Sequence, residues 1–356
     1  MEGSELLRIV DTIHREKDID PETLFEGIES ALLTAARKQY GTTGELIVRI
    51  DRSTGSIGAY EETPEGEIQI PLDLGRIAAQ TAKQVIIQRI REAERDVVFD
   101  EYVNQVDSIV NGTVQRYEGG TIIVNLGRSE GILPKHEQVR GEDYRVGDRI
   151  RAFCLDIKKA GQKVKIILSR SHPDFIRKLF ELEVPEMAEG LIIVRGLVRE
   201  AGYKTKMAVT SVDGKIDAIG ACVGVRGTRI KNVLDELRGE KVDVIRWSDS
   251  TEEIISNALK PAVVNYLTLD SENMRAKVVV DDDQLSLAIG KRGQNVRLAA
   301  KLCKWDISIL TESEMETGGH ELEESPDRIG RFDDDLELGG AGLTGAKDFE
   351  EPESEG

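Results

Sequence analysis

The sequence predicts a multidomain α+β protein: a helical and α/β N-terminal domain, a small β-barrel, two related α/β units and an acidic tail. Three observations support this prediction. A motif with glycine at both ends occurs twice in the same helix–loop–helix–strand context. A stretch of about 60 residues consists of short strands and glycine turns. Residues 312–356 are strongly acidic.

Composition narrows the class of protein. No apolar run approaches the ~20 residues that a membrane-spanning helix needs, so no membrane contact is expected. The N-terminus lacks the basic and apolar regions of a signal peptide, which predicts a cytoplasmic protein. The three cysteines and four histidines are isolated, so neither disulfides nor a metal or cofactor site is expected.

The net charge of −18 is unevenly distributed along the chain. Residues 312–356 hold 16 acidic and 3 basic residues, whereas residues 186–311 hold 18 acidic and 19 basic residues. The acidity therefore lies mostly in the tail, and the overall charge does not argue against nucleic-acid binding by residues 186–311.

Residues 1–106 are predicted to form the N-terminal domain. Apolar positions at helical spacing predict a helix over 4–16, and Asp20-Pro21 predicts the start of a second helix that runs to Tyr40. Strands are expected at Glu45–Asp51, just after the following turn, and at Glu67–Pro71. A long charged helix follows from Arg76 to about Val106, with a buried stripe predicted at Ile77, Val85, Ile86, Ile90 and Val97.

Residues 107–172 are predicted to form a five-stranded barrel of the OB type. Such barrels bind single strands by stacking bases on aromatic rings. In this region only Tyr117 and Phe153 are plausible stacking residues. A packed barrel with weak RNA contact is therefore an equal alternative. The five expected strands are Ile109–Arg116, Thr121–Leu126, Gly131–Leu133, Arg149–Ile157 and Lys163–Ser169.

Residues 173–260 and 261–311 are predicted to be two copies of one unit. The motifs Gly224–Gly227 and Gly290–Gly293 each follow a short apolar helix and precede a basic amphipathic helix and an apolar strand. One such motif is a weak signal, because glycine turns are common. Two copies in the same context favour a repeated functional module over a glycine turn used only for packing.

The GxxG motif suits a phosphate backbone. Glycine allows close approach because it has no Cβ, and the N–H groups and positive dipole end of the following helix favour an anion. The basic residues within and after each loop could contact phosphates or base edges, although a solvated surface role is equally open for each of those on the helices. The predicted RNA-binding residues are Gly224, Val225, Arg226, Gly227, Arg229, Lys231, Gly290, Lys291, Arg292, Gly293, Gln294, Asn295, Arg297, Tyr117 and Phe153.

No catalytic site is expected. Asp281-Asp282-Asp283 precedes a helix, where helix capping is the better explanation than metal binding. No nucleophile–base set or Walker-type loop is found. Residues 312–356 lack periodicity and are predicted to be a disordered acidic tail, which either shields the basic surface as a competitor or only solubilises the chain.

The modules resemble known families. The run Gly112-Thr113-Val114, Gly127–Pro134 and Tyr144–Asp148 resembles the S1 RNA-binding domain, and the two GxxG units resemble KH domains. Together with strings such as Leu179–Pro185 and Ala288–Ala299, the order of modules is similar to that of the NusA family of bacterial transcription termination/antitermination proteins. The resemblance covers about residues 4–311.

The resemblance implies a function. Residues 1–106 would bind the RNA polymerase core at the flap region of the β subunit, and the S1 and KH modules would bind nascent single-stranded RNA. The protein would be a monomeric elongation factor that modulates pausing, termination and antitermination with other antitermination factors. It also implies KH units of the prokaryotic α-β-β-α-α-β topology. The alternative is an RNA-binding factor in ribosome assembly or RNA turnover.

Overall fold

The computed structural model describes residues 3–17, 19–40, 45–63, 66–70, 76–161, 163–316 and 328–332. The chain divides into two compact units. The first comprises residues up to 137 together with 144–169, and the second comprises residues 138–143 and those from 170 onward.

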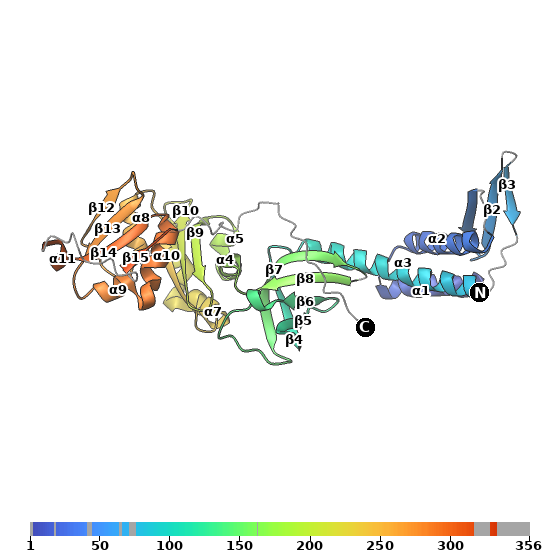
Figure 1. Ribbon diagram of the computed structural model, residues 1–356, viewed down its shortest axis with the longest axis horizontal. Coiled ribbons are helices and arrows are strands. Elements are labelled where there is room, and N and C mark those ends of the chain that lie inside the picture. The colour runs from blue at the N-terminus through green and yellow to red at the C-terminus, as the bar shows by residue number, and fades with distance from the viewer. Residues whose placement is uncertain are drawn as a thin grey trace, which may run out of the picture. The chain divides into compact units, whose positions relative to one another are not determined.

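The N-terminal part of the first unit is an α/β assembly (Figure 1). A three-stranded antiparallel sheet, in the order β1-β2-β3, packs with the helices around a core that includes Leu6, Phe25, Ile28 and Val48. All predicted elements of this region are present. Their bounds are α1 Gly3–Lys17, α2 Pro21–Tyr40, β1 Glu45–Ile50, β2 Ile57–Thr63, β3 Gly66–Ile70 and α3 Arg76–Val103.

Helix α3 contributes to two cores. Ile90 and Val97 pack on the N-terminal core as predicted, whereas Val98 and Phe99 pack on the core of the barrel. The helix ends at Val103, three residues before the predicted end. The predicted contacts of Ile77, Val85 and Ile86 lie outside the described side chains.

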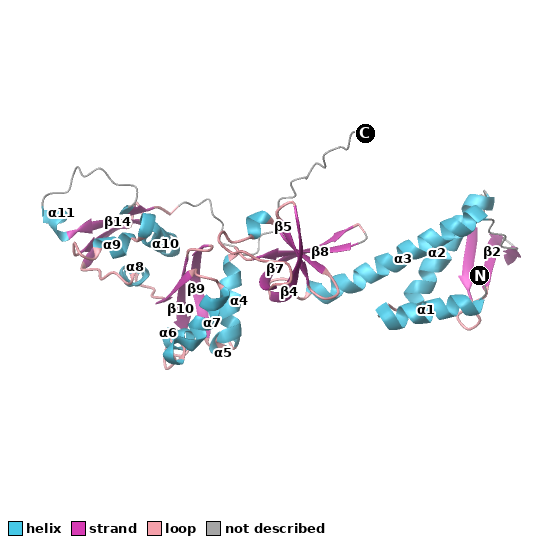
Figure 2. Ribbon diagram, turned by 90° about the horizontal axis from the view of Figure 1, so that it is seen from below, coloured by secondary structure: helices cyan, strands magenta, loops and turns pink. Residues whose placement is uncertain are grey.

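The rest of the first unit is the predicted closed barrel, with strand order β4-β5-β6-β8-β7 (Figure 2). Its interior is filled by aliphatic side chains such as Val124, Leu133, Ile166 and Leu168, because alternate residues of each strand point inward. The strands are β4 Ile109–Glu118, β5 Thr121–Asn125, β6 Glu130–Leu133, β7 Arg149–Ala160 and β8 Lys163–Ser169.

The second unit contains the two predicted repeats, each in the order α-β-β-α-α-β. In the first repeat β10 pairs with β9 in antiparallel and with β11 in parallel orientation. This confirms the implied topology. Its elements are α4 Pro173–Glu183, α5 Pro185–Ala188, β9 Ile192–Glu200, β10 Lys204–Ser211, α6 Ala218–Val223, α7 Thr228–Glu236 and β11 Lys241–Arg246.

Helix α8 (Thr251–Leu259), which the sequence analysis assigned to the first repeat, lies where the two repeats meet. Ile255 and Leu259 are buried in one core with Val278, Val296 and Ile309 of the second repeat, and the same core includes Ala208 and Ile245 of the first. The boundary at residue 260 stays a prediction. The other elements are β12 Tyr266–Asp270, β13 Arg275–Val280, α9 Leu285–Ile289, α10 Gln294–Cys303 and β14 Asp306–Thr311.

Two segments of the acidic tail have defined structure. Residues Glu312–Glu316 form a short helix, α11, and Ile329–Gly330 form a strand, β15, that pairs with β14. The prediction of a tail without structure from residue 312 onward therefore does not hold for these two segments. Residues 317–327 and 333–356 lie outside the described part of the chain.

Candidate nucleic-acid interface

The two GxxG loops have nearly the same backbone conformation. Gly224 and Gly290 have φ, ψ of 76°, 173° and 73°, 175°. Arg226 and Arg292, the third residue of each loop, have positive φ values of 53° and 54°. Positive φ is unfavourable for a residue with a side chain, and such strain is concentrated at functional sites. The repetition of this conformation in two sequences supports a shared role for the loops.

The first glycine of each loop is required by both conformation and space. A Cβ at Gly224 would lie 2.8 Å from Cγ of Arg229, and one at Gly290 would lie 2.7 Å from Cβ of Asn295. The combination of positive φ with ψ near 180° is accessible almost only to glycine. The backbone of each loop is therefore held close to the start of the following helix.

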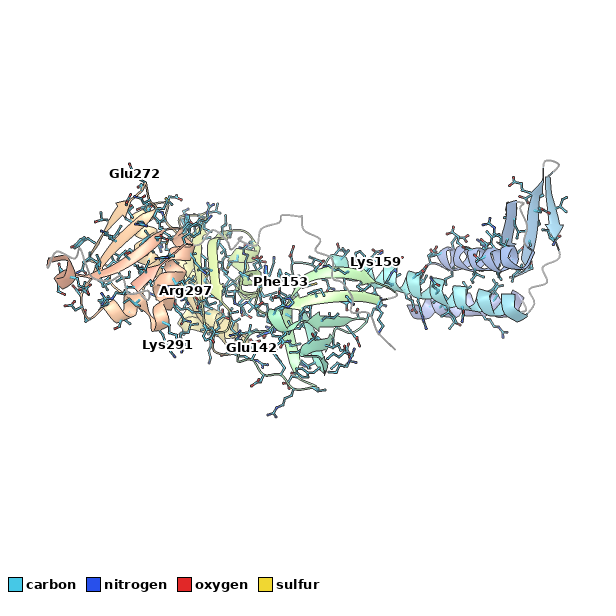
Figure 3. The ribbon with its side chains drawn as sticks, in the orientation of Figure 1. Glu142, Phe153, Lys159, Glu272, Lys291 and Arg297 are labelled. Carbon is cyan, nitrogen blue, oxygen red and sulfur yellow. The ribbon has the colours of Figure 1, made fainter. Side chains whose placement is uncertain are left out.

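Each loop lies at the N-terminus of a helix. Gly227 caps α7 and Gly293 caps α10, and neither provides a side-chain hydrogen bond to the first turn. The backbone N–H groups of Thr228 and Gln294, the first helical residues, donate to the carbonyl oxygens of Val225 and Lys291 within the loops. What favours an anion here is therefore the positive end of each helix dipole. Arg226, Lys291 and Arg292 are exposed, and no carboxylate within the described part of the chain forms an ion pair with them. The side chain of Lys291 is labelled in Figure 3.

Asn295 does not belong to this surface. It is only 3% exposed, and its side-chain amide donates hydrogen bonds to the carbonyl oxygens of Leu259, Leu287 and Ala288. Its carbonyl oxygen accepts from Lys204 Nζ at 3.1 Å. The prediction that Asn295 contacts RNA is wrong, because all of its polar atoms hold protein groups together.

Three other predicted residues form contacts within the second unit. Arg229 pairs with Glu186 at 3.0 Å, and Arg297 pairs with Glu200 at 2.6 Å. Gln294 also donates to Glu200, at 3.1 Å. Glu200 ends β9 of the first repeat, so Gln294 and Arg297 connect the two repeats. Lys231, which is the counterpart of Arg297 in the first repeat, is exposed.

The aromatic prediction for the barrel is only partly consistent with the structure. Tyr117 is 46% exposed, and its hydroxyl donates to the carbonyl oxygen of Tyr144. Phe153 is 1% exposed, so it cannot stack on a base. Its selection from sequence was wrong because an aromatic residue in a short strand can face either side of the barrel.

A charged cavity on the barrel was missed by the sequence analysis. It has a volume of about 620 Å³ and lies between α3 and the outer face of β4, β5, β6 and β8. Ile123 and Val164 contribute an apolar floor. A search for basic residues on outward positions of the strands would have found it, whereas the search for aromatic residues did not. The basic lining residues are Arg91, Arg95, Arg116, Arg128, Lys163 and Lys165, and the acidic ones are Glu94, Glu118 and Glu130.

Buried ionic groups fix the framework behind the loops. Arg199 and Glu240 form a bidentate pair at 2.9 Å, and both side chains are 1% exposed. Lys206 is fully buried and pairs with Asp243 at 2.9 Å. Burial alone would raise the pKa of Asp243, but the ammonium groups of Lys206 and Lys204 lower it below its usual range.

The cysteines show no sign of reactivity. Burial raises the pKa of Cys154 and of Cys222 to about 11, and that of Cys303 to about 12, so each remains a neutral thiol near neutral pH. Among the described residues, no group of histidine, cysteine and carboxylate side chains could hold a metal ion. No helix in this part of the chain is long and apolar enough to cross a bilayer.

An OB-type barrel followed by two GxxG units, each with exposed cations at the start of a helix, defines a multidomain protein of the RNA-binding class. Family models agree with this along the chain. They match the NusA N-terminal domain at residues 5–64 and 59–96, the S1 RNA binding domain at 104–171, the NusA-like first KH domain at 170–247 and the NusA-like second KH domain at 251–317.

Similar proteins extend over most of the chain. A relative from Bacillus subtilis is 39% identical over 359 residues, covering 92% of this chain and 97% of that protein. One from Halalkalibacterium halodurans is 39% identical, covering 89% and 91%, and one from Mycobacterium tuberculosis is 42% identical, covering 83% and 90%. All three carry the name transcription termination/antitermination protein NusA. The chain belongs to the NusA family of transcription termination/antitermination proteins and contains the S1 and KH domains of that family.

Proposed function

We propose that this chain is a cytoplasmic transcription elongation factor. It binds the RNA polymerase core, at the flap region of the β subunit, through its N-terminal domain. The barrel and the two KH units bind the nascent single-stranded RNA, and together these contacts modulate pausing, termination and antitermination with other antitermination factors. The protein acts as a monomer.

The backbone conformation that the two GxxG loops share is the main support for RNA binding. Both loops combine the positive end of a helix dipole with exposed cations, and both features favour binding of a phosphate backbone. The loops are unequal, because the second offers Lys291 and Arg292 and the first offers only Arg226. We therefore assign the larger share of phosphate contact to the second loop.

The charged cavity on the barrel supports a further RNA contact. Its cations surround an apolar floor, and it lies on the strand face that OB-type barrels use for oligonucleotides. Tyr117 remains the one residue of the predicted stacking pair that is accessible. Phosphate contact dominates over stacking here, because only 4% of the residues in the chain are aromatic.

Charge reversal in the second loop tests RNA binding. The double substitution Lys291→Asp, Arg292→Asp is expected to weaken binding of single-stranded RNA without unfolding the domain. The slope of log K against log salt should fall by about one for each lost phosphate contact. A matched control is Arg275→Asp, Lys277→Asp, because both are exposed cations on β13 at positions that alternate with buried residues. Equal behaviour of the two double variants would show that the loop is structural.

Polymerase binding separates this proposal from a role in ribosome assembly or RNA turnover. Those roles give no reason for the N-terminal domain. The full chain is expected to co-purify with the RNA polymerase core, and a chain that begins at Arg76 is expected to lose polymerase while retaining RNA affinity. If the full chain does not bind polymerase, the ribosomal alternative becomes the better interpretation.

A further inference from the structure

The second KH unit carries a fourth strand that comes from the tail. Strand β15 pairs with the free edge of β14 in antiparallel orientation, with Gly330 opposite Ile307 and Ile329 opposite Ser308 (Figure 1). The backbone N–H of Phe332 donates to Asp306 Oδ1 at 2.8 Å, and Arg328 pairs with Glu314 at 2.7 Å. Residues 328–332, which we call the tail strand, are therefore held at both ends.

The tail strand lies against α10 as well as β14. A Cβ on Gly330 would lie 2.4 Å from the carbonyl oxygen of Val296 and 2.8 Å from Cβ of Ala300. Both residues belong to the helix that begins at the GxxG loop. The backbone of the tail strand thus fills the groove between this helix and the edge strand, and only glycine fits at its centre.

The first KH unit has no counterpart of the tail strand among its described residues. Its sheet has the order β11-β10-β9, and no strand from the described residues pairs with the outer edge of β11. Helix α7 and strand β11 correspond in topology to α10 and β14, and their GxxG loops share one conformation. The tail strand is therefore an addition to the second copy and not a part of the module.

The position of the groove relates it to RNA. A GxxG loop contacts about four nucleotides of a single strand. We expect the bound strand to extend from the loop onto the adjoining surface of the domain. The adjoining surface is the groove between the helix and the edge strand. In the first unit no strand of the described residues pairs with the outer edge of β11. Backbone groups of this edge other than the Arg246 carbonyl oxygen, which accepts from Asn257 Nδ2, could therefore hydrogen-bond to base edges. In the second unit the tail strand occupies these groups of β14.

We propose that the tail strand occupies the RNA groove of the second KH unit and competes with single-stranded RNA for it. This inference rests on the RNA-binding function proposed above. The competition is by occupancy of the groove and not by charge, because the tail strand itself carries Arg328 and Arg331 and no acidic residue. It therefore differs from electrostatic shielding by the acidic residues of the tail.

Substitution of Gly330 tests the proposal in the full chain. Gly330→Val should displace the tail strand, because the side chain would collide with the Val296 carbonyl group. A groove that is filled about nine-tenths of the time raises the apparent Kd for RNA about tenfold, so we expect the variant to bind a labelled single-stranded RNA about three- to tenfold more tightly. The control is Gly339→Val, which places the same change in the tail outside the tail strand and should leave the Kd unchanged.

Salt distinguishes occupancy from shielding. The gain in affinity of Gly330→Val should persist at high salt, because both proteins carry the same charges. A gain that disappears at high salt would overturn the proposal in favour of shielding. A chain lacking residues 328–332 removes the tail strand in any case and is expected to show the same gain. An unchanged Kd in this deletion variant would also overturn the proposal.

A peptide added in trans completes the test. A peptide of residues 326–334 should weaken RNA binding by the Gly330→Val chain, and the same peptide with valine at position 330 should not. Failure of the peptide to compete would contradict the proposal. If neither the parent nor the variants bind single-stranded RNA, the proposed RNA-binding function itself fails, and this outcome is distinct from an equal affinity of all proteins.

Discussion

Neighbouring residues of the second GxxG motif have different roles. Lys291 and Arg292 extend into solvent, whereas Asn295 is buried and joins α10 to α8 and α9 through three carbonyl oxygens. It also accepts a hydrogen bond from Lys204 of the first repeat. Removing a buried polar partner leaves several groups unsatisfied, and this costs more than the loss of a surface contact.

The substitution Asn295→Leu is therefore predicted to destabilise the second unit by about 2–3 kcal/mol. Urea unfolding would measure this loss. Without urea, the folded variant should show the same slope of log K against log salt for RNA binding as the parent, because Asn295 contacts no phosphate. A reduced salt slope with unchanged stability would restore the original prediction that Asn295 contacts RNA.

The pair formed by Lys206 and Asp243 predicts a pH dependence. Asp243→Asn leaves the buried ammonium group of Lys206 without its carboxylate partner and is expected to cost about 3 kcal/mol at neutral pH. The folded-state pKa of Asp243 is lower than its unfolded value, so the stabilisation is complete above the unfolded value of about 4. It is lost as the pH falls through the lowered pKa.

Chemical unfolding of the parent and of Asp243→Asn between pH 7 and about pH 2 would measure how the stabilisation by this pair depends on pH. The difference in unfolding free energy should be constant near neutral pH and should shrink in the acid range, where Asp243 of the parent becomes protonated. The surface pair of Asp11 with Arg15 offers a control, because both side chains are largely exposed. Asp11→Asn should change stability little at any pH.

At the scale of elements, the periodic parts of the fold were predictable. Strand alternation and helical spacing located nearly all helices and strands, because burial on one face leaves a regular pattern in the sequence. The repeat to which helix α8 belongs could not be read from its pattern, since its apolar face packs in a core that contains residues of both repeats. The pairing of β15 with β14 involves only two residue pairs and leaves no periodic signal.

The candidate site was also predictable only in part. Glycine loops and their cations could be predicted, because backbone conformation depends on local sequence. The environment of each side chain depends on long-range packing. Nothing local distinguishes the half-exposed Tyr117 from the buried Phe153, or the exposed Lys231 from Arg297, whose partner Glu200 lies in the other repeat.

The loop conformation predicts a selective sensitivity to alanine. Gly290→Ala introduces a Cβ at positive φ with ψ near 180°, and this Cβ lies 2.7 Å from Asn295. We expect a loss of about 3 kcal/mol together with weaker RNA binding. Gly119→Ala is the control, since φ there is also positive but no atom lies within 4 Å, and its cost should be about 1–2 kcal/mol. Equal losses, measured by urea unfolding, would show that the contact with Asn295 has no effect.

At the scale of the whole molecule, the charge distribution indicates modest RNA affinity. The two repeats are nearly neutral, and the chain as a whole carries a net charge of −18. Affinity for a polyanion depends strongly on the number of phosphate contacts and on salt. Binding to polymerase would compensate for this, because it places the KH units close to the emerging RNA at a high effective concentration.

Tethering predicts that free RNA binding and action on polymerase respond differently to the same substitution. Lys291→Asp, Arg292→Asp should raise the Kd for free RNA more than it raises the protein concentration needed for half-maximal effect on pausing. The reason is that the effective concentration of tethered RNA, up to the millimolar range, can exceed even a weakened Kd. A chain beginning at Arg76 should show the opposite pattern, with RNA affinity retained and the effect on pausing lost. Equal factors in both assays for the loop variant would show that polymerase does not concentrate the RNA at the KH units.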